Sequence, residues 1–402
     1  MLLSDRKMLY LLLFVVAFGI YSFSGEGHPA LYDYYVRLAD AFLHGRLYLL
    51  EKTPWLAELI PFDKGYYVVY PPLPAILMMP LVALFGLGLN QTLVSVFFGG
   101  FGVVMANVVA RDVSKRDGEN EVARERTCLW AAVLFGFGTI FWWLASNGGV
   151  WLIAQVTSVF FLFMAIHEAF NKMRPLVMGL LVGASFWCRL PTILTIFFFV
   201  GLIISRQLNE GWRNKIRGAL PSLLWLAVGA GIFVFFDVMY NLVRFGTPFD
   251  VGYWMIPGIL EEPWFSEGLF SLSYIPVNLG VFLLGVPVFT ANPPFVLVPI
   301  TGLAIWVTTP AFIYALRSNV RDPVTWSSWF AIVAVAFVIF TKGLSGWGFG
   351  YRYAVDFYPF LYVLAVKDIG EKIKWHHKVV ICASIIVDLW GVLAVNRFGL
   401  IA

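Results

Sequence analysis

The sequence predicts an all-α membrane protein that crosses the bilayer many times, for three reasons. Of its 402 residues, 60% are hydrophobic and only 13% are charged, whereas a soluble domain is about 45–50% apolar and about 25% charged. The mean hydropathy is +0.80. Apolar runs recur along the whole chain, and about 20 such residues cross a bilayer core of roughly 30 Å. One integral membrane domain over residues 1–402 is therefore expected.

The first apolar run covers residues 8–23 and follows Arg6 and Lys7. Because no small-residue cleavage site comes after it, a retained first helix is favoured over a secretory signal peptide. The later clear runs each have the length and composition of a span. These runs cover 92–110, 128–145, 151–169, 219–240, 295–316, 326–340, 354–366 and 379–395.

Two further segments are apolar but interrupted. Residues 71–88 are rich in proline and glycine, and we expect them to lie along the outer interface or to dip into the membrane and return. Residues 176–204 are broken by Cys188-Arg189-Leu190-Pro191. We expect two short helices there that meet at an outer turn, because proline cannot continue a helix. The count is then about 11 transmembrane helices, or up to 13 if both interfacial candidates cross.

Short loops rich in Lys and Arg give the orientation, because such loops remain in the cytoplasm. Residues 206–217 carry four basic side chains against one acid, and residues 367–378 carry four lysines. We place both loops and the N-terminus in the cytoplasm. The long loops, 24–70, 241–269 and 342–352, and the C-terminus then lie on the outer side. The expected location is the plasma membrane of a prokaryote.

Several function classes lack support in the sequence. It contains no Walker, dinucleotide-binding or Ser-His-Asp pattern. Cys128, Cys188 and Cys382 have neither disulfide-framework nor zinc spacing. Nucleic-acid binding is not expected, because the Lys and Arg residues serve as topological signals. We expect no cofactor, and a divalent metal has no motif in its favour.

The first outer loop offers two acids near the membrane surface. Asp33 follows the first span closely, where its carboxylate can face a reaction; a helix cap or a solvated loop acid is the alternative. Asp40 lies at helical spacing from Arg37 and His44, which favours an ion pair on the face of a short amphipathic helix. His28 opens the same loop and is a further candidate for an outer site.

Arg189 is the most informative single charge. It interrupts a strongly apolar stretch, and an arginine at membrane depth costs at least about 2.5–3.5 kcal/mol. It therefore needs a partner. An anionic ligand and a counter-ion such as Asp237 are the two alternatives.

Other outer charges lie at predicted turns. Lys64 belongs to an Asp-Lys-Gly turn before an extended stretch, where it can hold a phosphate or stay solvated. Gly45 and Gly246 are expected to end helices. Arg244 and Asp250 flank the second of these glycines, among aromatic residues.

Residues 347–353 form a loop rich in glycine and aromatic residues that runs into a helix. Its backbone amides, together with Arg352, can cradle a phosphate at the N-terminus of that helix. Asp356 follows inside the helix and is another candidate for the outer site. The alternative is an interfacial belt of tyrosine and arginine.

In combination, these segments resemble the GT-C superfamily of membrane glycosyltransferases, which includes the protein O-mannosyltransferases and the lipid A aminoarabinose transferase. Each motif alone is weak, but together they cover most of the chain in order. The segments that carry the resemblance are Asp33 with 38–47, then 70–75, 85–86, 185–192, 240–253 and 351–353.

The resemblance implies a GT-C-like bundle, with a catalytic module over residues 1–240 and an outer loop with C-terminal helices over 241–402. It implies transfer of a hexose or pentose from a polyprenyl-phosphate donor, on the outer side and with inversion. The implied partners are that donor, membrane lipids, and a lipid, glycan or protein acceptor.

The resemblance also implies roles for individual residues. Asp33 is the implied base that deprotonates the acceptor hydroxyl, and Asp40 is the second catalytic candidate. Arg189 is implied to lie near the donor phosphate. Further candidates for binding that phosphate are Arg352, Lys64 and Arg244.

Two departures from the superfamily keep other functions open. Tyr32-Asp33-Tyr34 has one acid where many relatives have two, and residues 145–151 have none. A non-catalytic relative acting in envelope glycan assembly is therefore one alternative. The other is a transporter or lipid flippase, which predicts an internal repeat and ionisable residues near the bilayer midplane. Asp237 and Asp388 are acids inside clear spans, and no repeat is evident.

Overall fold

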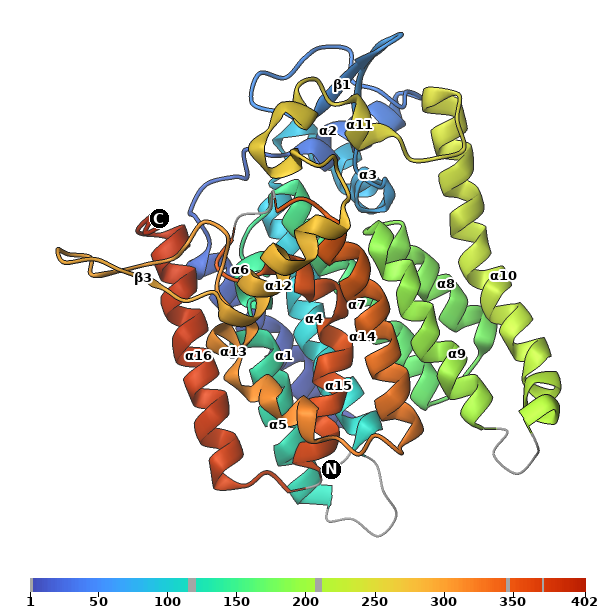
Figure 1. Ribbon diagram of the computed structural model, residues 1–402, viewed down its shortest axis with the longest axis vertical. Helices are drawn as coiled ribbons and strands as arrows, with labels where there is room; N and C mark the ends of the chain where they lie inside the picture. The colour runs from blue at the N-terminus through green and yellow to red at the C-terminus, as the bar shows by residue number, and fades with distance from the viewer. Residues whose placement is uncertain (1–2, 115–120, 207–211, 345–347, 371) are drawn as a thin grey trace.

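The computed structural model describes residues 3–114, 121–206, 212–344, 348–370 and 372–402, and they form a bundle of helices with loops gathered at one end (Figure 1). Six helices in these ranges are long and apolar enough to cross a membrane. Their outer faces expose apolar side chains such as Leu11, Leu12 and Val15, as a lipid-facing surface does. The six are α1 (Leu3–Ser24), α4 (Gln91–Val113), α7 (Val150–Phe170), α10 (Trp212–Phe245), α14 (Pro323–Thr341) and α16 (Trp375–Asn396).

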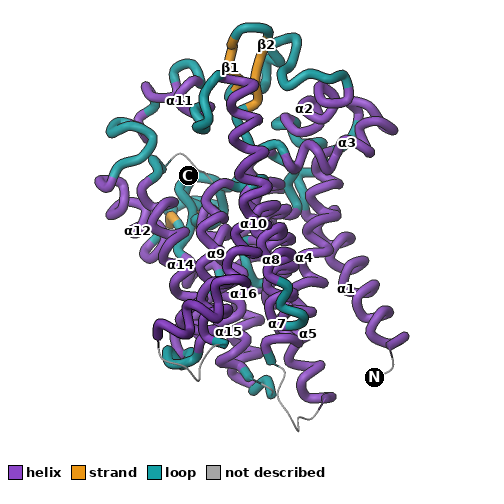
Figure 2. The backbone as a smooth tube through the Cα atoms, turned by 90° about the vertical axis from the view of Figure 1, so that its right-hand side faces the viewer, coloured by secondary structure: helices purple, strands orange, loops and turns teal. Residues whose placement is uncertain are grey.

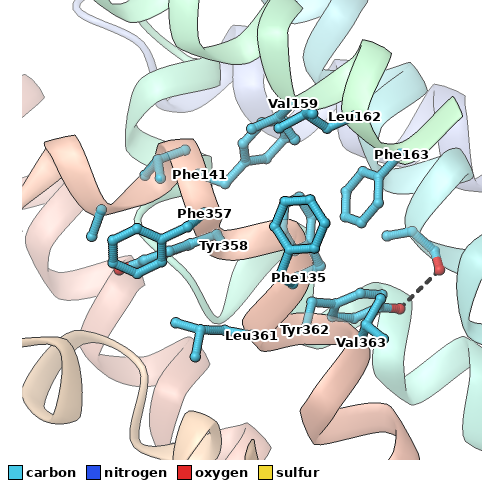
Figure 3. Close-up of a cluster of buried hydrophobic side chains, with 14 of the residues drawn as sticks. Phe135, Phe141, Val159, Leu162, Phe163, Phe357, Tyr358, Leu361, Tyr362 and Val363 are labelled. Atoms are coloured by element: carbon cyan, nitrogen blue, oxygen red, sulfur yellow. Dashed lines mark hydrogen bonds between the residues drawn. The ribbon is translucent and has the colours of Figure 1, made fainter. Parts of the chain in front are cut away.

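Aromatic side chains from several helices fill the centre of the bundle (Figure 3). Phe135 of α5 (Glu121–Phe137) lies 4.7 Å from the ring of Phe163 in α7 and 5.4 Å from the ring of Tyr362 in α15 (Tyr358–Ile369). The hydroxyl of Tyr362 donates to the carbonyl oxygen of Ala106 in α4 at 2.8 Å. The partner satisfies this hydroxyl, which would otherwise be costly to bury. Three helices, α4, α5 and α7, are thereby fixed around α15.

The interrupted segment 176–204 forms two short helices, as predicted. α8 (Pro175–Phe186) ends before Arg189, and a 3₁₀ turn η2 (Leu190–Thr195) leads into α9 (Ile196–Ser205). Arg189 has extended dihedral angles, φ −154° and ψ 103°, and Pro191 starts the turn. α8 also packs closely on α10, where a Cβ on Gly179 would lie 2.1 Å from the carbonyl oxygen of Leu226.

The end of the bundle opposite the start of α1, hereafter the loop end, carries the first long loop (Figure 2). The Asp63-Lys64-Gly65 turn is confirmed: it closes an antiparallel hairpin in which Phe62 pairs with Gly65. The apolar segment 71–88 is helical and packs on α2 in this layer (Figure 1). The elements are α2 (Tyr34–Leu43), β1 (Leu59–Phe62), β2 (Gly65–Val68), α3 (Leu73–Phe85), η1 (Gly86–Gly88), α11 (Gly252–Met255), η3 (Ile259–Glu261) and η4 (Pro263–Phe265).

One predicted span is wrong. Residues 295–316 do not form a single helix but a hairpin strand and two short helical pieces. Pro299 and Pro310 lack the amide hydrogen that a continuous helix needs, and Gly302 has a positive φ of 94°. The apolar helix α12 was not predicted. The elements here are η5 (Leu272–Tyr274), α12 (Ile275–Leu284), β3 (Val288–Phe289), β4 (Val296–Leu297), α13 (Ile305–Thr308) and η6 (Pro310–Arg317).

The predicted span 128–145 is also divided, because α5 ends at Phe137 and α6 (Phe141–Ala145) begins after Gly138. The last predicted span before α16 begins as a 3₁₀ turn, η7 (Arg352–Phe357), that continues into α15. The helical membrane architecture is thus confirmed, while the count of spans stays a prediction. The last turn of α9, the first turn of α10, the last turn of α15 and the first turn of α16 lie at the end where α1 begins (Figure 1), as the predicted orientation requires.

Candidate functional site

Two cavities lie where the loop end meets the helices. The first, about 410 Å³, is lined by Arg189 and is called the Arg189 cavity. The second, about 420 Å³, is lined by Arg352 and is called the Arg352 cavity. Trp151, in the first turn of α7, lines both. The cavities are therefore neighbours that share an indole wall.

Arg189 is held by an acid, but not by the one expected. Its Nε donates to both carboxylate oxygens of Asp356, at 3.2 and 3.0 Å. The counter-ion suggested from the sequence, Asp237, instead accepts a hydrogen bond from Asn241 at 3.2 Å. The side chain of Asp356 has no exposed surface, and that of Arg189 is 18% exposed. The pair thus joins η2 to η7 while Arg189 still lines its cavity.

Lys342 is a second cation in the Arg189 cavity that was not identified from the sequence. Its Nζ lies 4.8 Å from the ring centre of Tyr253 and 5.1 Å from that of Tyr353. The guanidinium of Arg189 lies 5.5 Å from the same Tyr353 ring. Within the described ranges, Lys342 has no carboxylate within 4.0 Å. Its charge is therefore available to a ligand.

The rest of the Arg189 cavity is largely apolar. Leu190, Ile193 and Leu194 come from η2, and Val338 and Ile339 come from the last turns of α14. These side chains lie below the two cations at the top of the helices. A cavity with apolar walls and a few convergent charges is the usual form of a small-molecule site.

Asp33 is flanked in the sequence by one residue from each cavity lining. It is the N-cap residue of α2, and its Oδ1 accepts from Arg37 Nε at 3.1 Å and from Trp55 Nε1 at 3.3 Å. Tyr32 lines the Arg352 cavity and Tyr35 lines the Arg189 cavity. Within the part of the chain that the structure describes, Asp33 itself lines neither cavity.

The expected ion pair between Arg37 and Asp40 is not formed, because Arg37 turns to Asp33 one turn earlier. Asp40 is 3.6 Å from His44 Nδ1 instead. The predicted helix-face pairing is therefore correct for His44 and wrong for Arg37.

Glu58 is an acid that the sequence analysis missed. Its Oε2 accepts a hydrogen bond of 3.0 Å from Nε1 of Trp151, the residue common to both cavities. Its backbone amide donates to the Tyr34 hydroxyl at 2.8 Å. Burial raises the pKa of the Glu58 carboxyl, although the nearby Lys342 and Arg352 charges act in the opposite direction. No local pattern marks Glu58, because it lies in an irregular stretch before β1.

The Arg352 cavity contains a buried cation. Arg352 is 6% exposed, and its guanidinium lies 4.9 Å from the Tyr353 ring. Its neighbours in the lining include His28, Asn147 and Arg397. The amide of Tyr351 does not point to a phosphate as the sequence suggested, because it donates to the carbonyl oxygen of Leu303 at 3.1 Å. Trp347, in the same predicted loop, lies outside the described residues.

The remaining predicted site residues are Arg244, Lys64 and Asp250. Arg244 is buried and donates to the carbonyl oxygen of Val68 and to Oδ1 of Asn241, both at 2.8 Å. It therefore ties α10 to β2. Lys64 is exposed in the hairpin turn. Asp250 lines the Arg189 cavity, and burial raises the pKa of its carboxyl.

The acids do not gather into a metal site. Within the described ranges, no group of three or more His, Cys, Asp or Glu side chains is placed to hold a metal ion. The first-loop acid Asp33 is already bonded to Arg37 and Trp55.

The fold is similar to that of an archaeal oligosaccharyltransferase, a membrane glycosyltransferase, and the resemblance inferred from the sequence is confirmed at the level of the fold. The apo crystal structure of the Archaeoglobus fulgidus oligosaccharyltransferase matches with a TM-score of 0.54 and 12% sequence identity, over 96% of this chain and 56% of that chain. A second structure of it, tethered to an acceptor peptide containing the NVT sequon, matches with a TM-score of 0.49, 13% identity and coverages of 97% and 55%. This chain thus spans little more than half of that enzyme. No protein-family model matches the chain, and no curated protein sequence does.

Proposed function

We propose that the protein is a membrane glycosyltransferase that transfers a sugar from a polyprenyl-phosphate donor to an acceptor hydroxyl at the loop end. The Arg189 cavity carries this proposal, because it combines an apolar wall with two cations, Arg189 and Lys342. A polyprenyl phosphate has an apolar chain, which the apolar wall can hold, and an anionic phosphate, which the cations can bind. The similarity in fold to a membrane glycosyltransferase supports the same class of reaction.

In this proposal the prenyl chain lies against the apolar residues of η2 and α14, and the phosphate lies against the cations. The acceptor oxygen attacks the anomeric carbon, the bond from that carbon to the phosphate oxygen breaks, and its electron pair leaves with the phosphate. Positive charges placed where that negative charge develops stabilise the transition state. Attack from the side opposite the leaving phosphate inverts the anomeric carbon.

A carboxylate has to take the proton of the acceptor hydroxyl. The superfamily resemblance favours Asp33, which is flanked in the sequence by one residue from each lining. The geometry adds Glu58, which is hydrogen-bonded to the indole shared by both cavities. The proposed active site is therefore centred on Trp151, with the donor in the Arg189 cavity.

The test is donor binding and sugar transfer by purified protein in liposomes that contain a labelled polyprenyl-phosphate sugar. Lys342→Gln is the first variant, because Lys342 has no ion pair among the described residues and its loss should leave the fold intact. We expect donor affinity to fall about tenfold or more, since a hydrogen bond to a charged group contributes about 1.5–3 kcal/mol. Arg321→Gln removes an exposed charge outside both cavities and serves as the control.

If the wild-type protein does not bind the polyprenyl phosphate, the proposal fails. If it binds the donor and translocates it without transferring sugar, the flippase alternative is supported. If it binds the donor but neither transfers nor translocates it, the non-catalytic alternative is supported.

A further inference from the structure

Arg352 is a buried cation without a matching anion. Its Nε and Nη1 are both buried, and neither has a hydrogen-bond partner among the described residues. Two acids act electrostatically on Arg352, Asp356 and Glu58, but Asp356 is already bonded to Arg189 and to Gln155 Nε2, and Glu58 is bonded to Trp151. The backbone of Arg352 is fixed, because its carbonyl oxygen accepts a hydrogen bond of 2.8 Å from Gln155.

A buried guanidinium without hydrogen-bond partners destabilises the folded protein unless a ligand supplies an anion. A buried charge is stable only when it is paired and hydrogen-bonded. The guanidinium fork fits the two oxygens of a phosphate or carboxylate. Because Arg352 lines a cavity of about 420 Å³, a ligand has room to reach it.

The charged residues around the cavity also favour an anionic ligand. Arg397 and His28 also line it, and its acid, Glu26, lies 3.6 Å from Nε2 of His28. The side chains of Glu26 and His28 are 37% and 56% exposed, so they mark the mouth. Arg397 is held in place by a hydrogen bond to the carbonyl oxygen of Phe23. Arg397 is itself exposed, so Arg352 is the charge at the buried end of the cavity.

We propose that the Arg352 cavity is the acceptor site and that it binds an oxyanion, a phosphate or carboxylate carried by the acceptor. This inference rests on the proposed function, which places the donor phosphate in the other cavity. Trp151 separates the two cavities, and Glu58 is bonded to that indole. An acceptor anchored at Arg352 therefore presents its hydroxyl towards Trp151, where the sugar of the donor lies.

The experiment uses two small anions and one lipid as probes. Affinities of methyl phosphate and acetate are measured from the thermal stabilisation of the purified full-length protein, and undecaprenyl phosphate binding is measured by native mass spectrometry. The variants are Arg352→Gln and Lys342→Gln, with Arg321→Gln as the control of equal charge. Without any anion, Arg352→Gln should unfold at the wild-type temperature or above, because it removes an unpaired buried charge.

We expect Arg352→Gln to weaken binding of at least one small anion about tenfold or more, while undecaprenyl phosphate binding stays at the wild-type level. Loss of methyl phosphate binding alone identifies a phosphate-bearing acceptor, and loss of acetate binding alone a carboxylate-bearing one. If neither anion depends on Arg352, the inference is overturned.

The inference is also overturned if undecaprenyl phosphate binding falls as much in Arg352→Gln as in Lys342→Gln, because Arg352 would then belong to the donor site. A wild-type protein that does not bind the lipid would refute the proposed function, and with it the assignment of the anion to an acceptor. The small-anion measurements would still decide whether Arg352 forms an oxyanion site.

Discussion

At the scale of single residues, the candidate bases differ in their surroundings. Asp33 forms an ion pair with Arg37 and accepts a hydrogen bond from Trp55. Glu58 is bonded to an indole and buried, and burial raises the pKa of its carboxyl. A base is most effective when its pKa lies near the working pH. Glu58 therefore holds its proton more firmly than an ordinary glutamate does.

Asp33→Asn is expected to lower turnover at least about a hundredfold, the lower limit of what a general base contributes. The amide keeps the shape of the side chain and removes its basicity. Asp40→Asn should cost far less, because Asp40 contacts His44 on the helix face. Transfer of labelled sugar in reconstituted protein measures both. Wild-type activity in Asp33→Asn would move the role of base to Glu58.

Glu58 should leave a signature in the pH dependence of stability. Because the folded-state pKa is raised, the folded protein binds this proton more tightly than the unfolded chain does. The stability due to Glu58 is fully present below the ordinary glutamate pKa of about 4.3 and is lost as the pH rises through the raised pKa. Glu58→Gln should therefore gain stability relative to wild type as the pH rises through that window. The stability of both proteins is measured by thermal unfolding from pH 4 to 8, roughly the range in question. A difference in unfolding temperature between Glu58→Gln and wild type that stays constant over this range would contradict the prediction.

At the scale of elements, the break between α8 and α9 positions the first cation. Pro191 and the 3₁₀ turn end the helix, and Arg189 reaches across to Asp356 in η7. This ion pair joins two segments that are 167 residues apart. Because the carboxylate of Asp356 is fully buried, it depends on this partner.

Arg189→Ala should destabilise the protein by about 3–5 kcal/mol, the usual cost of leaving one partner of a buried ion pair alone. The double variant Arg189→Ala, Asp356→Ala should recover part of that loss, and Arg189→Lys should keep most of the stability. Thermal unfolding in detergent measures the series. Losses that simply add in the double variant would show that the two side chains do not depend on each other.

At the scale of the whole molecule, the predicted topology has a direct test. Reporter tags at Asn209, which lies outside the described residues, and at Lys372 should report the cytoplasm. Tags at Glu58 and Glu262 should report the outer side. The basic loops at one end of the bundle are the reason. A cytoplasmic signal at Glu58 would place both cavities on the wrong side for the proposed donor.

Local signals in the sequence predicted the local structure well. Gly45 and Gly246 have positive φ angles at helix ends, and the Asp63-Lys64-Gly65 turn and the break near Arg189 formed as expected. Each depends on the conformational preference of a glycine or proline. The prediction of a span over residues 295–316 was wrong, because their composition fits a span although their prolines break the helix.

The partners of the site residues could not be predicted in this way. Lys342 lines the Arg189 cavity, while Asp356 and Glu58 bond to the lining residues Arg189 and Trp151. These contacts join distant segments, which no local pattern encodes. The same is true of the position of Arg352 in a separate cavity from Arg189. The sequence identified the type of residue at the site, and the packing of the helices decided which charges meet.

The shared indole of Trp151 has a consequence for an activated donor. Water is a competing nucleophile for any glycosyl phosphate, and hydrolysis would waste the sugar whenever no acceptor is bound. In the proposed active site, Trp151 would keep water in the acceptor cavity away from the anomeric carbon until the acceptor hydroxyl displaces that water. Trp151→Ala should therefore raise the ratio of free sugar released to sugar transferred. The selectivity of the enzyme for its acceptor over water would then depend on one aromatic ring.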